Sequence, residues 1–364
     1  MTGRLAHIPT LQPDETLSSF ILRLANNHVS TAQELCTLVW PKTEFWTRDV
    51  DRTASDALIC AVSQSTGVSC QALQAATLRD LVVNLGYQVC DRGQQPGILP
   101  IGISRQTRRR HGQQFCASCI EQKPVYLRRS WRLEFVVACP DHGELLRDGC
   151  PACDAPFVPH RRHALIRGVC HECGSSLVAS PSEAVNFEAL SLQRLALNAL
   201  RAVHMWSAPA IGPKDSAVSS SPKEYLDGLR KLCRLATRHR MQFSEELVPN
   251  NTWALLRVQQ RASVMAQVHQ WLKAGPAVWI DWAARTKLTQ NHLESEYGSW
   301  PNWLKPMLEQ LPYALGPVGI RRQRKPKTTI RMLRKQCASR SQYSETRAAM
   351  LLGLVRQTRG ASFI

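Results

Sequence analysis

Cysteine and histidine residues at metal-ligand spacing are concentrated in one stretch of the sequence. Between residues 116 and 173 the chain has three Cys-x-x-Cys pairs and one Cys-x-x-His pair. Each pair presents two ligand atoms to one ion, and two pairs complete a tetrahedron around Zn²⁺. The predicted zinc ligands are Cys116, Cys119, Cys139, His142, Cys150, Cys153, Cys170 and Cys173.

The pairs can be combined in two ways. Sequential pairing builds one site from the first four ligands and a second site from the last four, whereas an interleaved pairing is also compatible with the spacing alone. His142 is assigned as a ligand because it completes a turn that follows a Cys-x-x-Cys pair, and His171 is expected to point away from the metal. Four protein ligands leave no coordination position for a catalytic water, so both ions are expected to be structural.

The remaining cysteines lack metal-ligand spacing. They are Cys36, Cys60, Cys70, Cys90, Cys233 and Cys337, and several lie on apolar helix faces, so we expect core thiols. The first 13 residues lack the apolar segment of a signal peptide, which predicts a cytoplasmic protein in which cysteines stay reduced. No apolar run approaches the ~18 residues of a membrane span.

The charge of the chain indicates a polyanionic partner. Lys and Arg number 46 against 28 Asp and Glu, a formal net charge of +18. Arginine clusters suit phosphate contacts, so nucleic acid is the expected partner, although some of these arginines could instead pair with acids inside the fold. The candidate nucleic-acid-binding residues are Arg105, Arg108, Arg109, Arg110, Arg128 and Arg129 near the first zinc turn, and Arg321, Arg322, Arg324, Lys325 and Lys327 near the carboxy terminus.

Hydrophobic periodicity predicts a mainly α fold. In the amino-terminal segment, apolar residues from Leu17 to Leu24 repeat at helical spacing, and Ser30 is a predicted N-cap for the next helix. A helix over about 53–65, a break at Gly67 and a short helix through Leu73 form the pattern of a helix-turn-helix. A small helical domain that does not touch DNA fits the same pattern.

Composition shifts divide the chain into four predicted segments. Residues 1–100 form the helix-turn-helix domain, and residues 101–180 form a tandem zinc-ribbon or zinc-finger block with little β structure, where Tyr126 to Val137 could supply a strand. A carboxy-terminal helical domain follows over 181–320, with a flexible linker at about 207–222 and tryptophans expected in its core. Residues 321–364 form a basic tail, in which an amphipathic helix at about 342–355 could dock on a partner protein.

Sequence motifs of catalysis are missing. The chain has no GxxxxGK[ST] loop, no HExxH motif and no GxSxG motif, and no carboxylate triad can be singled out. The chain is therefore expected not to be an enzyme.

Several segments of the sequence, taken together, resemble the TniQ/TnsD family. They are the opening run HIPTLQPDETLSSFILRLANNH, the turn FCASC, the segment YLRRSWRLEFVVACPDHGELL, and the later CPAC and CHEC turns. The resemblance covers about residues 5–180 and implies the same eight zinc ligands on two Zn²⁺ ions.

This resemblance implies a non-enzymatic target-selection protein of a DNA transposon. Such proteins bind target DNA or an RNA-guided CRISPR effector and recruit the AAA+ ATPase of the element and its transposase, and some form homodimers. Two alternatives stay open from the residues: a zinc-containing helix-turn-helix transcriptional regulator and a zinc-ribbon nuclease.

Overall fold

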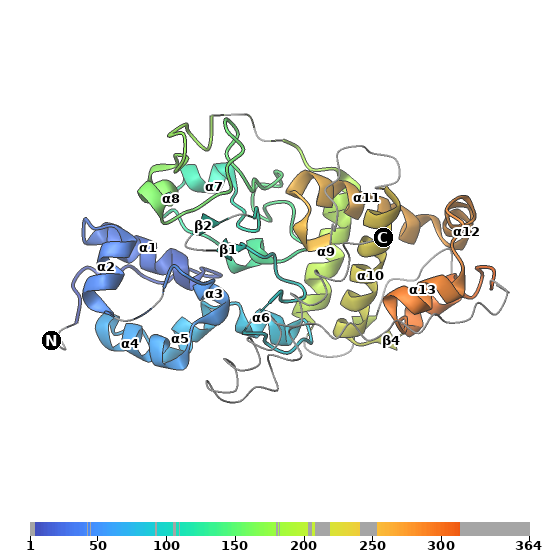
Figure 1. Cartoon of the computed structure of the whole chain (residues 1–364), viewed down its shortest axis with the longest axis horizontal. Helices are drawn as coiled ribbons and strands as arrows, with labels where there is room; N and C mark the ends of the chain where they lie inside the picture. The colour runs from blue at the N-terminus through green and yellow to red at the C-terminus, as the bar shows by residue number, and fades with distance from the viewer. Residues whose placement is uncertain are drawn as a thin grey trace, which may run out of the picture. The chain divides into compact units, whose positions relative to one another are not determined.

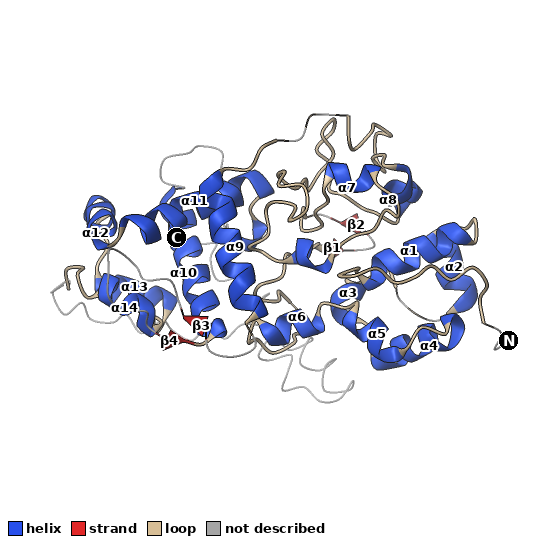
Figure 2. Ribbon diagram, turned by 180° about the vertical axis from the view of Figure 1, so that it is seen from behind, coloured by secondary structure: helices blue, strands red, loops and turns tan. Residues whose placement is uncertain are grey.

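A computed structural model describes most of the chain before residue 314. The described residues are 4–41, 43, 45–91, 93–104, 107–108, 110–179, 181, 183–202, 206–207, 219–240 and 253–313. The chain divides into two compact units, Met1–Tyr313 and Ala314–Ile364, and all the described residues lie in the first. The described part is mainly helical, as the sequence predicts (Figures 1 and 2).

Six helices form the amino-terminal segment: α1 (Leu17–Asn27), α2 (Ala32–Val39), α3 (Val50–Thr53), α4 (Asp56–Thr66), α5 (Cys70–Ala75) and α6 (Arg79–Asn84). The predicted apolar face of α1 is buried. The predicted N-cap at Ser30 is wrong by one residue. Thr31 caps α2 because its hydroxyl accepts from the Glu34 amide while the Glu34 carboxylate accepts from the Thr31 amide.

Helices α4 and α5 follow one another across a short turn. Helix α4 begins three residues later than predicted because the Ser55 side chain caps it by accepting a hydrogen bond from the Leu58 amide. Gly67 ends it in the left-handed region at φ 76°, and Ser69 then caps α5. Two consecutive helices across a short turn do not by themselves establish a helix-turn-helix, so both this motif and the binding of DNA by the pair stay predictions.

The cysteine-rich segment is largely irregular. Its short elements are β1 (Ile103–Ser104) and β2 (Thr107–Arg108), which pair antiparallel, α7 (Ala117–Glu121), the 3-10 turns η1 (Arg129–Arg132) and η2 (Arg161–His163), and α8 (Ala164–Arg167). The strand expected between Tyr126 and Val137 is wrong. No described strand lies alongside this stretch; instead Leu127 bonds to the Ser19 hydroxyl and Val137 to the Gln193 amide oxygen.

Long helices form the carboxy-terminal part of the first unit. The elements are α9 (Phe187–Arg201), β3 (Trp206–Ser207), β4 (Ser219–Ser220), α10 (Pro222–Arg240), η4 (Trp253–Leu255), α11 (Val258–Ala274), α12 (Pro276–Arg285), α13 (Gln290–Tyr297), η5 (Asn302–Leu304) and α14 (Lys305–Leu308). Helices α9, α10 and α11 pack against one another (Figure 1), and β3 pairs with β4. Trp271, Trp279, Trp300 and Trp303 are buried, as predicted.

Buried polar contacts cross the predicted segment boundaries. Arg132 lies in the cysteine-rich segment and is fully buried, and it bonds to Asp49 of the amino-terminal segment. Arg261 of α11, also fully buried, bonds to the Gln114 side chain at 2.6 Å. The four-segment division stays a prediction. Most of the expected linker (208–218) and the whole basic tail lie outside the described residues.

Candidate metal centres

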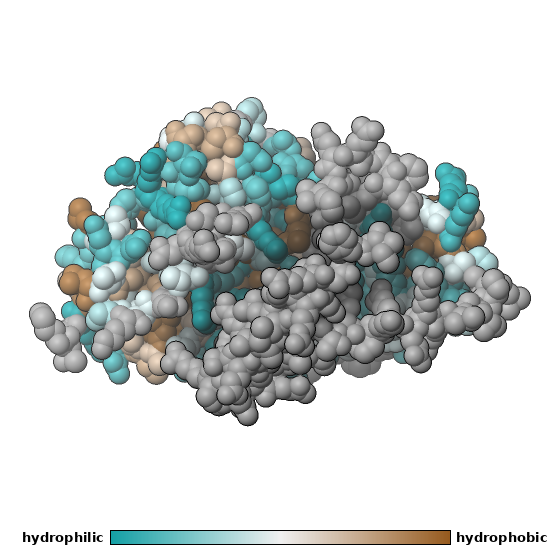
Figure 3. All heavy atoms as spheres, viewed as in Figure 1, coloured by the Kyte–Doolittle hydropathy of each residue, from teal (hydrophilic) through white to brown (hydrophobic). Residues whose placement is uncertain are grey.

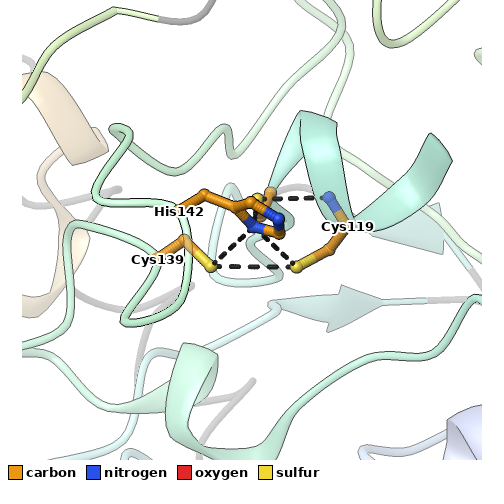
Figure 4. Close-up of side chains that lie close together, drawn as sticks. Cys119, Cys139 and His142 are labelled. Carbon is orange, nitrogen blue, oxygen red and sulfur yellow. Dashed lines mark hydrogen bonds between the residues drawn. The ribbon is translucent and has the colours of Figure 1, made fainter. Parts of the chain in front are cut away.

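The first predicted zinc site is assembled from α7 and the loop after η1. We call it site 1. Cys116 is the N-cap just before α7, and Cys119 lies within this helix. Cys139 and His142 lie together in a turn later in the segment. His142 Nδ1 lies 3.3 Å from the sulfurs of Cys116 and Cys119 and 3.5 Å from that of Cys139. Figure 4 shows the His142 ring facing the sulfurs of Cys119 and Cys139, which are 3.7 Å apart.

The second predicted site, called site 2, is assembled from two turns in the irregular part of the segment. The Cys150 and Cys173 sulfurs are 3.7 Å apart, and the Cys153 and Cys170 sulfurs are 3.8 Å apart. Cys150 and Cys170 are buried, whereas Cys153 and Cys173 are exposed. The structure thus brings the ligands together in the sequential grouping, and His171 belongs to neither cluster.

The spacing of the donor atoms fits tetrahedral coordination. Zn–S bonds of about 2.3 Å at a tetrahedral angle separate the sulfurs by about 3.8 Å, and a Zn–N bond of about 2.0 Å separates nitrogen from sulfur by about 3.5 Å. The ligand atoms within each cluster all lie within 4.8 Å of one another. Both clusters could therefore hold a metal ion without rearrangement of the chain.

Backbone amides and neighbouring thiols donate hydrogen bonds to several of these sulfurs, which favours the negatively charged thiolate. The Cys119 amide donates to the Cys116 sulfur, and in site 2 the Ala152 and Glu172 amides donate to Cys150 and Cys170. Hydrogen bonds from the Cys116 and Cys119 thiols lower the pKa of Cys139. In site 2, hydrogen bonds from Ser175 lower the pKa of Cys173 to about 6. Other thiols of the same clusters shift the opposite way: a hydrogen bond with Cys119 raises the pKa of Cys116, and burial raises the pKa of Cys150. Each cluster thus has one thiol whose pKa is lowered toward the thiolate form that binds a metal.

Two polar neighbours of site 1 were missed in the sequence. The Glu144 carboxylate accepts hydrogen bonds from the backbone amide and the hydroxyl of Ser118, each at 3.0 Å, so it holds the first turn of α7 in place. The Gln122 side-chain amide lies 2.8 Å from His142 Nε2, the ring nitrogen that faces away from the sulfurs. Such contacts orient a ligand ring and select its tautomer. Neither residue has a spacing signal in the sequence, because both act through the folded turn.

Arg257 joins site 2 to the carboxy-terminal helices. Its guanidinium donates to Asp148 Oδ1 at 2.8 and 2.9 Å and to Asp154 Oδ2 at 2.8 Å, next to the ligand Cys153. The other Asp148 oxygen accepts from the Val258 amide at the start of α11. Asp148 is only 1% exposed and the Arg257 side chain is 30% exposed, so this ion pair is partly shielded from solvent, and it fixes the Cys150–Cys153 turn to α11.

Substituting Arg257→Ala is expected to weaken metal retention at site 2 by about 10-fold, since neighbours that orient ligands commonly contribute that much. It should also lower the free energy of unfolding by about 1.5–3 kcal/mol, because the buried Asp148 carboxylate loses its charged partner. The measurement is metal release to a chromogenic chelator combined with urea unfolding. Arg285→Ala is the matched control, since Arg285 pairs with Asp281 at an exposed position of α12. Equal metal release from both variants would contradict the role of Arg257.

Two of the predicted nucleic-acid-binding arginines near site 1 form ion pairs within the fold. Arg128 pairs with Asp141 and lies over the Tyr126 and Trp131 rings, with its guanidinium carbon 5.4 and 5.8 Å from their centroids. Arg129 pairs with Asp80 at 2.8 Å and Asp14 at 3.4 Å. These two arginines pair with acids inside the fold, the alternative left open by the sequence.

The remaining candidate nucleic-acid-binding residues either have no ion pair in the described ranges or lie outside those ranges. Arg110 has no ion pair with any residue in the described ranges. Arg105 and Arg109 lie outside the described residues, as do the side chain of Arg108 and the five tail candidates Arg321, Arg322, Arg324, Lys325 and Lys327. In the part of the chain that the structure describes, no helix is both long and apolar enough to span a membrane.

Comparison with known proteins identifies one family. Residues 6–146 match the family model TniQ, a span that runs from the segment before α1 to Leu146, just after site 1. It includes all four ligands of site 1 and ends before the ligands of site 2. A search of curated proteins finds no match.

Proposed function

We propose that the chain, whose residues 6–146 match TniQ, an adaptor family associated with transposition, selects target sites for a DNA transposon without catalysing a reaction itself. In this role it binds target DNA or an RNA-guided CRISPR effector and recruits the AAA+ ATPase and the transposase of its element in the cytoplasm. The observation that carries the proposal is the TniQ match over residues 6–146 together with the two preformed Cys/His clusters.

Zinc is the metal that we propose for both clusters. One cluster offers three sulfurs and one imidazole nitrogen and the other four sulfurs, donor sets typical of structural Zn²⁺. Four protein ligands at each site suit a structural ion, whose role is to hold a loop-rich segment in shape. This chain's own residues then act by positioning: Glu144 holds α7, and Arg257 holds the Cys150–Cys153 turn.

An adaptor also needs a surface for protein partners. Val29 and Leu38, beside and within α2, are 97% and 82% exposed. Hydrophobic surface is visible over this part of the molecule on the left of Figure 3. A shallow cavity of about 920 Å³ lies beside it, lined in part by Leu5, Leu35 and Val39. Exposed apolar patches commonly mark protein contacts, which supports a protein partner at this face.

Co-purification and crosslinking test the proposal. The purified chain is mixed at low salt with the AAA+ ATPase of its element, with duplex DNA and with the CRISPR effector, and the crosslinks are mapped by mass spectrometry. We expect capture of the ATPase and crosslinks to either DNA or the effector. Tight binding to a defined operator without any partner would instead support the transcriptional regulator, and metal-dependent nicking of plasmid DNA would overturn the non-enzymatic role.

Within this proposal, the salt dependence of DNA binding separates the candidate arginines. Arg110→Ala is expected to remove one phosphate contact and so to reduce the magnitude of the slope of log affinity against log salt by about 1. Arg129→Ala should change that slope less, because Arg129 already pairs with Asp80 and Asp14. The measurement is a fluorescence titration of duplex DNA at several salt concentrations, with the folding of each variant checked by circular dichroism. A larger change for Arg129→Ala than for Arg110→Ala would contradict this assignment.

A further inference from the structure

Two thiols outside both metal clusters lie together on α4 and α5. The sulfurs of Cys60 and Cys70 are 3.9 Å apart. Cys60 is exposed and Cys70, the first residue of α5, is partly exposed. The expectation that these were core thiols is therefore wrong for Cys60, and the pair is accessible to small reagents. Of the other cysteines outside the clusters, Cys36 and Cys233 are buried, as expected, Cys90 is only partly buried, and Cys337 lies outside the described residues.

The backbone holds the two sulfurs at this separation. Each helix begins at a serine N-cap, Ser55 for α4 and Ser69 for α5, and Gly67 ends α4 in the left-handed conformation between them. Ile59 next to Cys60 is 2% exposed and Leu73 of α5 is fully buried, so both helices are anchored in the core. A disulfide needs sulfurs about 2.05 Å apart, so the two sulfurs must approach each other by less than about 2 Å.

We propose that Cys60 and Cys70 form a redox-modifiable dithiol, which a peroxide converts reversibly into a disulfide linking α4 to α5. The thiol of one cysteine releases its proton, and the resulting thiolate attacks an oxygen of hydrogen peroxide. The O–O bond breaks and the leaving hydroxide takes up the released proton, so a sulfenic acid and one water are formed. The second sulfur then attacks the sulfenic sulfur, the S–S bond forms, the S–O bond breaks, and a second water leaves. The two sulfurs lose two electrons to the peroxide, and a dithiol reductant returns them.

The disulfide restricts the helix pair. It closes the segment 60–70 across the turn at Gly67, so α4 and α5 can no longer separate or rotate freely against each other. Amide hydrogen exchange within residues 56–75 is therefore expected to be slower in the oxidised protein than in the reduced one. This consequence does not depend on the proposed role in transposition.

Peptide mapping tests the proposal directly. The reduced full-length chain is treated with increasing hydrogen peroxide, the remaining thiols are alkylated with N-ethylmaleimide, and the protein is digested with trypsin. Cys60 and Cys70 fall in one tryptic peptide, residues 53–79, because no Lys or Arg lies between Arg52 and Arg79. We expect this peptide to appear lighter by two hydrogen atoms and without alkylation, and dithiothreitol should restore two alkylated cysteines. Metal content measured in parallel identifies the peroxide doses that leave both clusters intact.

Matched variants make the result specific. Cys60→Ser and Cys70→Ser should each abolish the crosslinked peptide, whereas Cys90→Ser should leave it unchanged, since Cys90 is a partly exposed cysteine outside the pair. The proposal is overturned if residues 53–79 stay doubly alkylated at doses that oxidise Cys90. It is equally overturned if Cys60 and Cys70 are found only in disulfides to other peptides.

Discussion

Cys139→Ser is expected to leave the protein with one bound metal ion instead of two and to be the most damaging single substitution in the cysteine-rich segment. Cys139 and Cys116 are fully buried, and three ligands of site 1 belong to the hydrophobic core. Binding of a structural Zn²⁺ contributes about 10–16 kcal/mol in small zinc domains. That contribution is comparable to the roughly 5–15 kcal/mol by which a typical domain is stable, so loss of the ion should unfold the segment around site 1.

The comparison with site 2 makes this prediction sharper. Cys173→Ser should also remove one metal, but Cys173 is exposed, so fewer core contacts depend on it and a larger part of the chain should stay folded. Metal per chain is measured by plasma mass spectrometry, and folding by thermal unfolding and near-ultraviolet circular dichroism. Cys90→Ser, at a partly exposed cysteine outside both clusters, is the control and should retain two ions. A Cys139→Ser protein with two ions and an unchanged melting temperature would show that site 1 is not a metal centre.

Arg132→Ala is expected to lower the free energy of unfolding by about 3–5 kcal/mol, the usual cost of removing one partner from a buried ion pair. The Arg132 guanidinium is fully buried and donates to Asp49 at 2.5 and 3.2 Å and to the Leu99 carbonyl at 2.9 Å. Asp51 lies 3.8 Å from it and accepts from the Ser18 amide and hydroxyl. Without the arginine, two acidic groups remain close together in a site with little solvent.

The pH dependence of this loss follows from the same geometry. Burial raises the pKa of Asp51, and the nearby Asp49 raises it further. In the variant, a carboxyl with a raised pKa in the folded state destabilises the protein when it is charged, and it takes up a proton as the pH falls. The loss of stability caused by Arg132→Ala should therefore become smaller as the pH falls through this raised pKa, before aspartate in the unfolded chain begins to take up protons.

Urea unfolding at several pH values measures the loss. Arg79→Ala is the control, because the Arg79–Asp56 pair is solvent-exposed at 3.5 Å and should contribute no more than about 1 kcal/mol. A similar loss for both variants, or a deficit for Arg132→Ala that widens as the pH falls, would contradict the buried-charge argument.

Local features of the fold were predictable because they depend on neighbouring residues. The face of α1 and the end of α4 at Gly67 follow from side-chain periodicity and from the φ angle that glycine adopts at low cost. The sequence predictions were wrong where two neighbouring residues could each cap a helix, or where hydrogen-bond partners distant in the sequence determined the backbone conformation. Thr31 replaced Ser30 as a cap because Glu34 can complete a reciprocal pair with it. Tyr126 to Val137 formed no strand because its hydrogen-bond partners come from three separate segments.

The metal clusters illustrate the same division. A Cys-x-x-Cys or Cys-x-x-His turn is set by four consecutive residues, so the sequence alone singled out the eight residues that the structure gathers into two clusters able to hold a metal ion. Which turns share an ion was left open by the spacing, and the structure resolved it by placing the Cys139 turn against α7. Tertiary structure alone likewise decided which acids pair with Arg128, Arg129 and Arg132. It also decided the ion pair of Arg257 with Asp148 and the proximity of Cys60 to Cys70. Charge and thiol chemistry depend on which groups lie within a few ångströms, and for these residues only the packing of distant segments sets those distances.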